Sequence, residues 1–195
     1  MGKIFYLMGK SSSGKDTIYK RLMSNEKLAL KNIVLYTTRP IRSGEQDGAE
    51  YYFVSKQGLQ DLLKVNKVIE KRTYHTCLGD WTYFTVDDEN IDLSHQNYLM
   101  IGTIESFQKT KEYYGADRVI PIMIELDDGI RLSRALHREM AQSEPKYSEM
   151  CRRFLADEAD FSEEKKQEAG ITQTFVNEDL EICLSQIEAY ILSQT

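Results

Sequence analysis

The sequence has few of the features that mark exported or membrane-bound proteins. It contains only three cysteines, Cys77, Cys151 and Cys183, which are odd in number and far apart. We therefore expect a reducing, cytoplasmic location, with neither a disulfide framework nor a metal site. The longest apolar runs are much shorter than the ~20 residues of a membrane-spanning helix. The apolar start Met1–Met8 lacks a cleavage site, so it is interpreted as a first strand and not as a signal peptide.

Positive charge is also in deficit. The chain has 25 Lys and Arg against 31 Asp and Glu, which gives a net charge of −6 at pH 7. This balance argues against broad binding to nucleic acid or to anionic membranes. Any ligand that carries phosphate must therefore meet cations that are clustered locally.

What the 195 residues do contain is an alternation of short apolar runs with segments of helical periodicity. The expected strands are Ile4–Met8, Ile33–Tyr36, Tyr98–Ile101, Val119–Leu126 and Thr174–Val176. The expected helices are Lys15–Glu26, Ile104–Tyr114, Gly129–Ala141 and Asp179–Leu192. Strands that alternate with crossover helices predict an α/β fold, in which helices flank a parallel sheet on both faces.

Two stretches depart from this alternation. Residues 37–86 are richer in Tyr, Thr, Phe, Val and Gly, and the runs Glu50–Ser55 and Thr82–Val86 are typical of strands, so a small, mostly β insertion is expected. Residues 129–166 are charged and helical. The arginines of this second stretch are Arg131, Arg134, Arg138, Arg152 and Arg153.

The length predicts a single domain, 1–195, since domains typically hold roughly 100–200 residues. Within it we expect the core to comprise residues 1–36, 87–128 and 167–195. The insertion would be 37–86, and 129–166 would form a further, charged helical segment.

A glycine-rich loop follows the first expected strand and opens a helix. It consists of Gly9, Lys10, Ser11, Ser12, Ser13, Gly14, Lys15, Asp16 and Thr17. Backbone N–H groups in such a loop, together with the helix N-terminus, bind phosphate, and Lys15 is placed to reach the β- and γ-phosphates of ATP. The G-x-x-x-x-G-K-[ST] pattern has a hydroxyl residue directly after the lysine, but here Asp16 stands there and Thr17 follows. Asp16 and Thr17 are the two candidates for a contact to Mg²⁺ through water.

A second motif runs from Tyr36 to Ser55. Arg39 and Arg42 lie three residues apart in a loop with proline and glycine, so their guanidinium groups can converge on one phosphate. Tyr51 can add a hydroxyl donor and an aromatic face. By composition alone, a solvated loop without a ligand is the favoured interpretation of this stretch.

Together with the glycine-rich loop, this stretch closely resembles guanylate kinase, whose nucleotide-monophosphate site has the pattern T-T-R-x-x-R-x-G-E-x-x-G-x-x-Y-x-F-V-S. The residues in register are Arg39, Arg42, Gly44, Glu45, Gly48, Tyr51, Phe53, Val54 and Ser55. The resemblance spans essentially the whole chain, because residues 176–180 are similar to the family's adenine-contacting segment. It implies a P-loop NTPase-type fold, in which 37–86 is the NMP-binding insertion and 129–166 forms a helical lid with its adjoining helix.

The resemblance also implies a role for each matching residue. The implied ATP-binding residues are Gly9, Lys10, Ser11, Ser12, Ser13, Gly14, Lys15, Asp16, Thr17 and Asn177. The implied GMP-binding residues are Arg39, Arg42, Glu45, Tyr51, Glu70, Tyr83 and Thr85, with Glu70 accepting from guanine N1 and N2. The implied catalytic residues are Lys15, Arg42, Arg134, Arg138 and Arg153. Arg152 competes with Arg153 for the place of the third lid arginine.

The chain departs from the family at three further places. Leu35 and Tyr36 precede T-T-R, where small hydroxyl residues are usual. Residues 79–85 are one residue longer than the family's turn and carry Phe84 in place of its glycine. After the strand near residue 100, Gly102 stands at the aspartate of I-D-x-x-G, and Glu105 follows three residues later.

The implied activity is phosphorylation of GMP, and of dGMP, by ATP with Mg²⁺ as cofactor, with GDP and ADP as products of the main reaction. ATP and GMP are thus the expected partners of a monomer or homodimer. One alternative is ribose 1,5-bisphosphate phosphokinase, a relative that often has G-K-D-S where this chain has residues 14–17. The motif around Arg39 argues against it, since that motif serves a purine monophosphate. The other alternative is a non-catalytic binding module, although such modules usually lose the ATP loop that is kept here.

Overall fold

The central feature of the computed structural model is a five-stranded sheet in the order β2-β7-β1-β8-β9. The structure describes residues 1–42, 44–76, 79–88 and 91–195. The five strands are β1 (Ile4–Gly9), β2 (Leu30–Asn32), β7 (Asn97–Gly102), β8 (Val119–Glu125) and β9 (Thr174–Val176). All neighbouring pairs run parallel. The predicted α/β fold with a parallel sheet is therefore confirmed.

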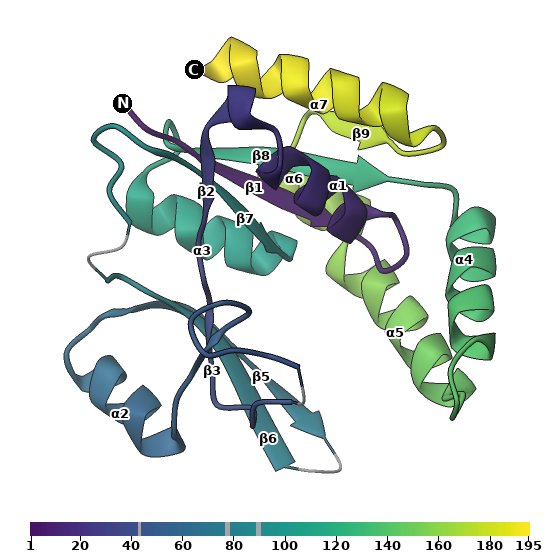
Figure 1. Cartoon of the computed structure of the whole chain (residues 1–195), viewed down its shortest axis with the longest axis horizontal. Helices are drawn as coiled ribbons and strands as arrows, with labels where there is room; N and C mark the ends of the chain where they lie inside the picture. The colour runs from purple at the N-terminus through teal and green to yellow at the C-terminus, as the bar shows by residue number, and fades with distance from the viewer. Residues whose placement is uncertain (43, 77–78, 89–90) are drawn as a thin grey trace.

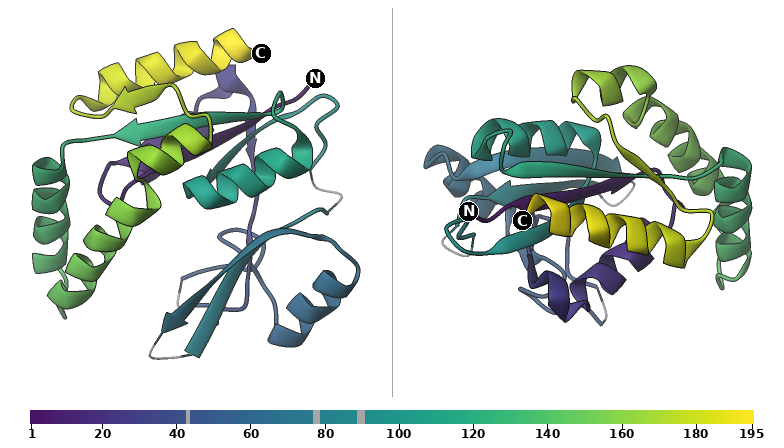
Figure 2. Two further views of the ribbon diagram at one scale, coloured as in Figure 1. Left: turned by 180° about the vertical axis from the view of Figure 1, so that it is seen from behind. Right: turned by 90° about the horizontal axis from the view of Figure 1, so that it is seen from above.

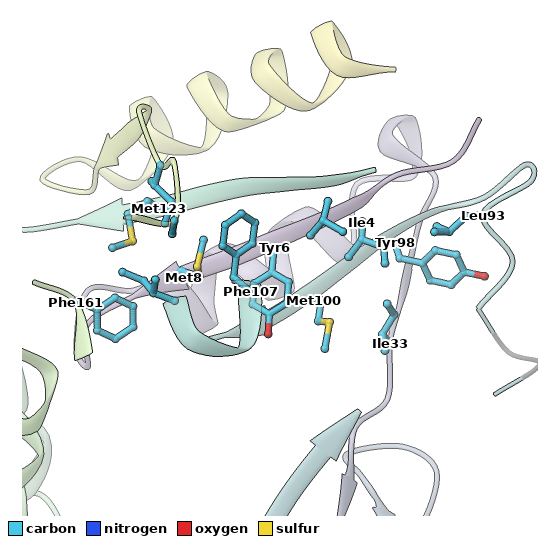
Figure 3. Packing of buried hydrophobic residues seen from close by; sticks show 14 residues of the cluster. Ile4, Tyr6, Met8, Ile33, Leu93, Tyr98, Met100, Phe107, Met123 and Phe161 are labelled. Carbon is cyan, nitrogen blue, oxygen red and sulfur yellow. The ribbon is translucent and has the colours of Figure 1, made fainter. Parts of the chain in front are cut away.

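Helices cover both faces of this sheet (Figures 1 and 2). They are α1 (Lys15–Met23), α3 (Ile104–Tyr114), α6 (Glu163–Glu168) and α7 (Leu180–Gln194), and a short 3-10 helix occupies Glu26–Leu28. Strand β1 is buried along its full length, and its side chains alternate between two cores. Phe5 and Leu7 pack with α1 and α7. Tyr6 and Met8 pack on the other face with Phe107 of α3 (Figure 3).

The insertion forms a second, four-stranded sheet in the order β4-β3-β6-β5. Its elements are β3 (Tyr36–Thr37), β4 (Tyr52–Phe53), α2 (Lys56–Lys64), β5 (Val68–Thr76) and β6 (Gly79–Val86). The long pair β5 and β6 is antiparallel, with Glu70 opposite Thr85 and Arg72 opposite Tyr83. Residues directly opposite one another in such a pair share a face, so these four side chains lie on one side of the sheet.

Two expectations for the region around the insertion are corrected. The strand predicted at Ile33–Tyr36 is wrong, because the pairing with β7 is made by Leu30–Asn32 and Tyr36 already belongs to the small sheet. Ile33 is apolar because it packs in the core without being in a strand. The strand expected at Glu50–Ser55 is shorter. Helix α2 was not predicted, although Ser55 caps it by accepting from the N–H of Gly58.

A helical arm extends from the carboxyl end of the sheet. It comprises α4 (Asp128–Met140) and α5 (Tyr147–Asp160), and α5 runs back toward the loop after β1 (Figure 1). The Asp127 side chain caps α4 by accepting from the N–H of Ile130. Within the described ranges no helix is long and apolar enough to span a membrane. Cys151 is exposed and Cys183 is buried, and both are free thiols, whereas Cys77 and Ser43 lie outside the described residues.

Candidate active site

The loop after β1 (residues 9–17, hereafter the phosphate loop) has a backbone suited to close approach of an anion. Ser12 and Gly14 adopt left-handed φ angles of 64° and 91°. The side chain of Asn177 supports the loop, since its Nδ2 donates to the carbonyl of Ser13 at 2.7 Å. A Cβ on Gly14 would lie 2.2 Å from this Nδ2, so glycine is required there. Asn177 thus fixes the shape of the loop, and its predicted contact with ATP stays a prediction.

The phosphate loop also presents unused polar groups. The hydroxyls of Ser12 and Ser13 are buried and have no hydrogen-bond partner in the described ranges. Lys15 is the first residue of α1, where the helix dipole is positive. Buried donors without partners are costly, and a phosphate oxygen would satisfy them. This arrangement suits the triphosphate of ATP.

A contact from the arm to this loop was not predicted. The backbone N–H of Ser11 donates to Oδ2 of Asp157 on α5 at 2.7 Å. Arg131 of α4, with 1% of its surface exposed, donates from Nη1 to the carbonyl of Ser11 at 3.0 Å. Glu158 accepts from both Arg131 and Lys10, at 2.9 and 2.7 Å. The arm is therefore bound to the phosphate loop by charge-assisted hydrogen bonds, which are stronger than neutral ones.

The second motif brings its predicted residues together. Arg39 is buried, with Cζ 5.5 Å from the ring of Tyr51 and 5.4 Å from that of Phe53. Both of its Nη atoms donate to Glu45, at 3.0 and 2.7 Å. Glu45 also accepts from the backbone N–H of Arg42 at 2.8 Å. The hydrogen bond from Arg39 holds the pKa of Glu45 below its ordinary value. As a carboxylate, Glu45 orients the Arg39 guanidinium and holds the backbone at Arg42.

The far end of the same face carries Glu70 and Thr85. Both are buried, and the Thr85 hydroxyl donates to Oε1 of Glu70 at 2.9 Å. Burial raises the pKa of Glu70, which the nearby charge of Arg72 and the hydrogen bond from Thr85 lower in part. Tyr83 lies between this pair and the phosphate end, with its ring 5.5 Å from that of Tyr51. The face therefore offers a carboxylate at one end and cations at the other.

The cations predicted to be catalytic lack carboxylate partners in the part of the chain that the structure describes, although Cζ of Arg42 lies 5.8 Å from the ring centre of Trp81. They make no side-chain hydrogen bond or ion pair to any described residue, and they are Lys15, Arg42, Arg134, Arg138 and Arg153. Arg42, Arg138 and Arg153 line one cavity of about 560 Å³, together with Ser11 of the phosphate loop. This cavity therefore joins the insertion, the arm and the loop.

Arg134 and Arg152, two arm arginines that do not line this cavity, have different neighbours. Nη1 of Arg134 lies 3.8 Å from the position that a Cβ on Gly14 would take, so it faces the phosphate loop. Arg152 donates to Glu149 on its own helix at 2.7 Å, and its side chain is 64% exposed. These contacts favour Arg153 over Arg152 as the third lid arginine.

Gly102 has a structural explanation. A Cβ at this position would lie 2.4 Å from the hydroxyl oxygen of Tyr6 and 2.7 Å from Oγ of Ser106. These two hydroxyls are hydrogen-bonded to each other at 2.7 Å. They fill the space into which the family's aspartate would project. Glu105 lies exposed in the first turn of α3, and its negative charge raises the pKa of Glu70.

The described residues contain no group of three His, Cys, Asp or Glu side chains that could hold a metal by itself. Asp16 and Thr17 are exposed at the start of α1, beside Lys15. One or two protein oxygens together with substrate phosphates are the ligands that Mg²⁺ commonly takes. The donor set therefore fits a magnesium ion that arrives with ATP.

Comparisons with known proteins agree with this geometry. Residues 1–194 match the family model described as guanylate kinase. The chain is 28% identical over 194 residues to a guanylate kinase of Porphyromonas gingivalis, covering 98% of this chain and 97% of that protein. It is 39% identical over 91 residues to a guanylate kinase of Neisseria gonorrhoeae, covering 47% and 42%. The crystal structure of guanylate kinase from Anaplasma phagocytophilum superposes with a TM-score of 0.66 at 20% identity, over 99% of this chain and 86% of that one.

Proposed function

This chain belongs to the guanylate kinase family, and we propose that it transfers the γ-phosphoryl group of ATP to the phosphate of GMP, releasing GDP and ADP. We include dGMP as a second acceptor. The observation that carries the proposal is the set of unpaired cations around one cavity, with Arg42 from the insertion facing Arg138 and Arg153 from the arm. All three side chains are exposed and have no carboxylate partner among the described residues, so their guanidinium groups are free to bind a ligand, and phosphate matches their geometry.

The donor nucleotide would bind at the phosphate loop. Loop N–H groups and Lys15 would hold the β- and γ-phosphates, and Arg134 would approach from the arm. Magnesium bound with ATP would neutralise part of the phosphate charge, and Asp16 and Thr17 are the residues placed to hold it.

The acceptor would lie across the face of β5 and β6. Arg39 and Tyr51 would bind its phosphate, with Arg39 held in place by Glu45. Glu70 would accept hydrogen bonds from guanine N1 and N2, and adenine would be rejected because it lacks those donors.

Phosphoryl transfer needs no covalent bond to the protein, so the side chains act by positioning the nucleotides and stabilising charge. The charge that develops on the transferring group would be stabilised by Arg42, Arg138 and Arg153, which approach from two sides of the cavity. Closure of the arm over the bound nucleotides would exclude water from the γ-phosphate, which would limit hydrolysis of ATP.

The competing hypothesis is a kinase for ribose 1,5-bisphosphate, which the replacement of the family's acid by Gly102 and the presence of Asp16 favour. The test is the rate of ADP release with GMP, dGMP, AMP and ribose 1,5-bisphosphate as acceptors. The proposal predicts stimulation by GMP and dGMP and little by AMP. Stimulation by the ribose compound alone would overturn it, and no stimulation by any acceptor would favour a binding module.

A further inference from the structure

Arg72 is a partly buried cation that the proposed chemistry does not use. It lies two residues after Glu70 on β5, on the same face, and opposite Tyr83. Its Nε is 3.7 Å from Oε2 of Glu70. Its Nη1 donates to the hydroxyl of Thr103 at 2.9 Å. The Arg72 side chain is 18% exposed and that of Glu70 is 3% exposed, so the pair is largely withdrawn from water.

The location of Arg72 is electrostatically unfavourable without carboxylates. Thr103 is the N-cap of α3, and a helix N-terminus repels a cation. The ion pair with Glu70 on β5 offsets this repulsion, and Glu105 places a further negative charge in the first turn of α3. The guanidinium is therefore held where it is by the acid that the proposed function assigns to guanine.

The charge balance around Glu70 depends on this one cation. Burial raises the pKa of Glu70, and the charge of Glu105 raises it further. The charge of Arg72 and the hydroxyl of Thr85 act in the opposite direction. From β1, the buried hydroxyl of Tyr6 also lies within electrostatic reach of Glu70. Without Arg72, the Thr85 hydroxyl alone would oppose burial and the charge of Glu105, so the neutral carboxyl would be favoured.

Only the ionised carboxyl suits guanine. A carboxylate accepts hydrogen bonds at both oxygens, whereas a protonated carboxyl carries a hydrogen on one of them. The N1 and N2 atoms of guanine both donate, so a protonated Glu70 would place a donor against a donor.

We propose that Arg72 is a positioning residue for guanine recognition, which keeps Glu70 ionised and oriented toward the base by pairing with it and with Thr103. This inference rests on the proposed function. Arg72 acts through Glu70 and does not touch the reacting groups. Replacing Arg72 would therefore weaken binding of the acceptor, and would weaken it more at low pH than at high pH.

The sign of the pH effect follows from the carboxyl. When Arg72 is replaced by methionine, the pKa of Glu70 rises, so the carboxyl becomes protonated at a higher pH than in the wild type. The KM for GMP then increases as pH falls through the new pKa. A pKa that is higher by one corresponds to about a tenfold change in the protonation equilibrium. The kcat and the KM for ATP stay near their wild-type values.

The test compares kcat/KM for GMP across pH in the wild type, Arg72→Met and Arg72→Lys. We expect Arg72→Met to raise the KM for GMP at least about tenfold near pH 6 and by much less near pH 8.5. Arg72→Lys should keep most of the wild-type profile. Lys71→Met is the matched control, because Lys71 is exposed and adjacent on the opposite face of β5.

A role in folding alone gives a different result. It would raise KM equally at all pH values, or lower kcat, and that outcome would overturn the proposal. Carbon-13 NMR of the Glu70 carboxyl in the ligand-free protein tests the same idea without an acceptor. A higher Glu70 pKa in Arg72→Met supports the pairing, and an unchanged one overturns it. The two measurements also separate this inference from the proposed function. If the wild type does not phosphorylate GMP but Arg72→Met still raises the Glu70 pKa, the proposed function and the guanine role are overturned. The pairing of Arg72 with Glu70 is then still supported.

Discussion

The carboxylate of Asp157 accepts a hydrogen bond from the backbone N–H of Ser11 at a distance of 2.7 Å. Ser11 belongs to the phosphate loop, whose N–H groups are suited to phosphate oxygens, so a carboxylate of the arm occupies a donor that an anionic ligand would also use. Arg131 and Lys10 offset part of the negative charge that Asp157 and its neighbour Glu158 bring to the loop. The contact that attaches the arm to the phosphate loop thus weakens the attraction of the loop for phosphate.

Removing the charge of Asp157 should strengthen ATP binding. We expect Asp157→Asn to lower the Kd for ATP by about three- to tenfold, because a like charge a few ångströms from a phosphate is repulsive even when partly screened. Calorimetry in the absence of acceptor measures this. Asp160→Asn, an exposed carboxylate at the end of the same helix, is the control. Weaker binding in Asp157→Asn would show that Asp157 supports the loop and does not compete with phosphate.

Lys15 should be indispensable for turnover but not for folding. Lys15→Ala removes the side chain that the proposed function assigns to the β- and γ-phosphates, and we expect kcat to fall by a factor on the order of 10³ or more. The unfolding midpoint should change little, since Lys15 makes no ion pair within the described ranges. Lys20→Ala, an exposed lysine of the same helix, should leave kcat unchanged. Near-normal activity of Lys15→Ala would contradict the mechanism.

Arg152 and Arg153 form a matched pair for testing the lid. Arg153 lines the cavity with Arg42 and Arg138, whereas Arg152 is paired with Glu149. We expect Arg153→Ala to lower kcat by a factor of about 10²–10³, with a smaller change in KM. Arg152→Ala should stay close to wild type, because exposed ion pairs contribute little. The opposite ranking in steady-state kinetics would exchange the roles of the two residues.

Gly102 should tolerate no side chain. A methyl group there would meet the hydroxyl of Tyr6 at 2.4 Å and Oγ of Ser106 at 2.7 Å, so Gly102→Ala should lower the free energy of unfolding by about 1–3 kcal/mol. Urea denaturation measures the loss. Tyr6→Phe removes the nearest atom, so the stability lost through Gly102→Ala should be smaller in the Tyr6→Phe background than in the wild type. A fully stable Gly102→Ala would mean that the hydroxyl pair can move aside.

The parallel core and the phosphate loop could be predicted from the sequence because their signals are local. Apolar runs mark the strands, and Gly9, Gly14 and Lys15 lie together in the chain. The strand expected at Ile33–Tyr36 was wrong because Ile33 packs in the core just after a strand has ended. In the sequence, such a residue cannot be told from an apolar residue within a strand.

Other features depend on contacts between distant segments. Nothing in the sequence around Asp157 indicates that it reaches Ser11, since the two are 146 residues apart. Arg72 resembles an ordinary strand arginine until its distance to Glu70 and its bond to Thr103 are known. Arg131 is one of several arginines in a charged helix, and its burial and its bonds to Ser11 and Glu158 distinguish it from Arg134 and Arg138.

The most direct test of the central claim is the fate of the γ-phosphoryl group. ATP labelled with ³²P at the γ position is incubated with the protein, Mg²⁺ and GMP, and the products are separated by chromatography. The proposed function predicts label in GDP, in amounts equal to the ADP formed, and its loss in Lys15→Ala. Label that appears only as inorganic phosphate, or that enters ribose 1,5-bisphosphate but not GMP when both are offered, would contradict it.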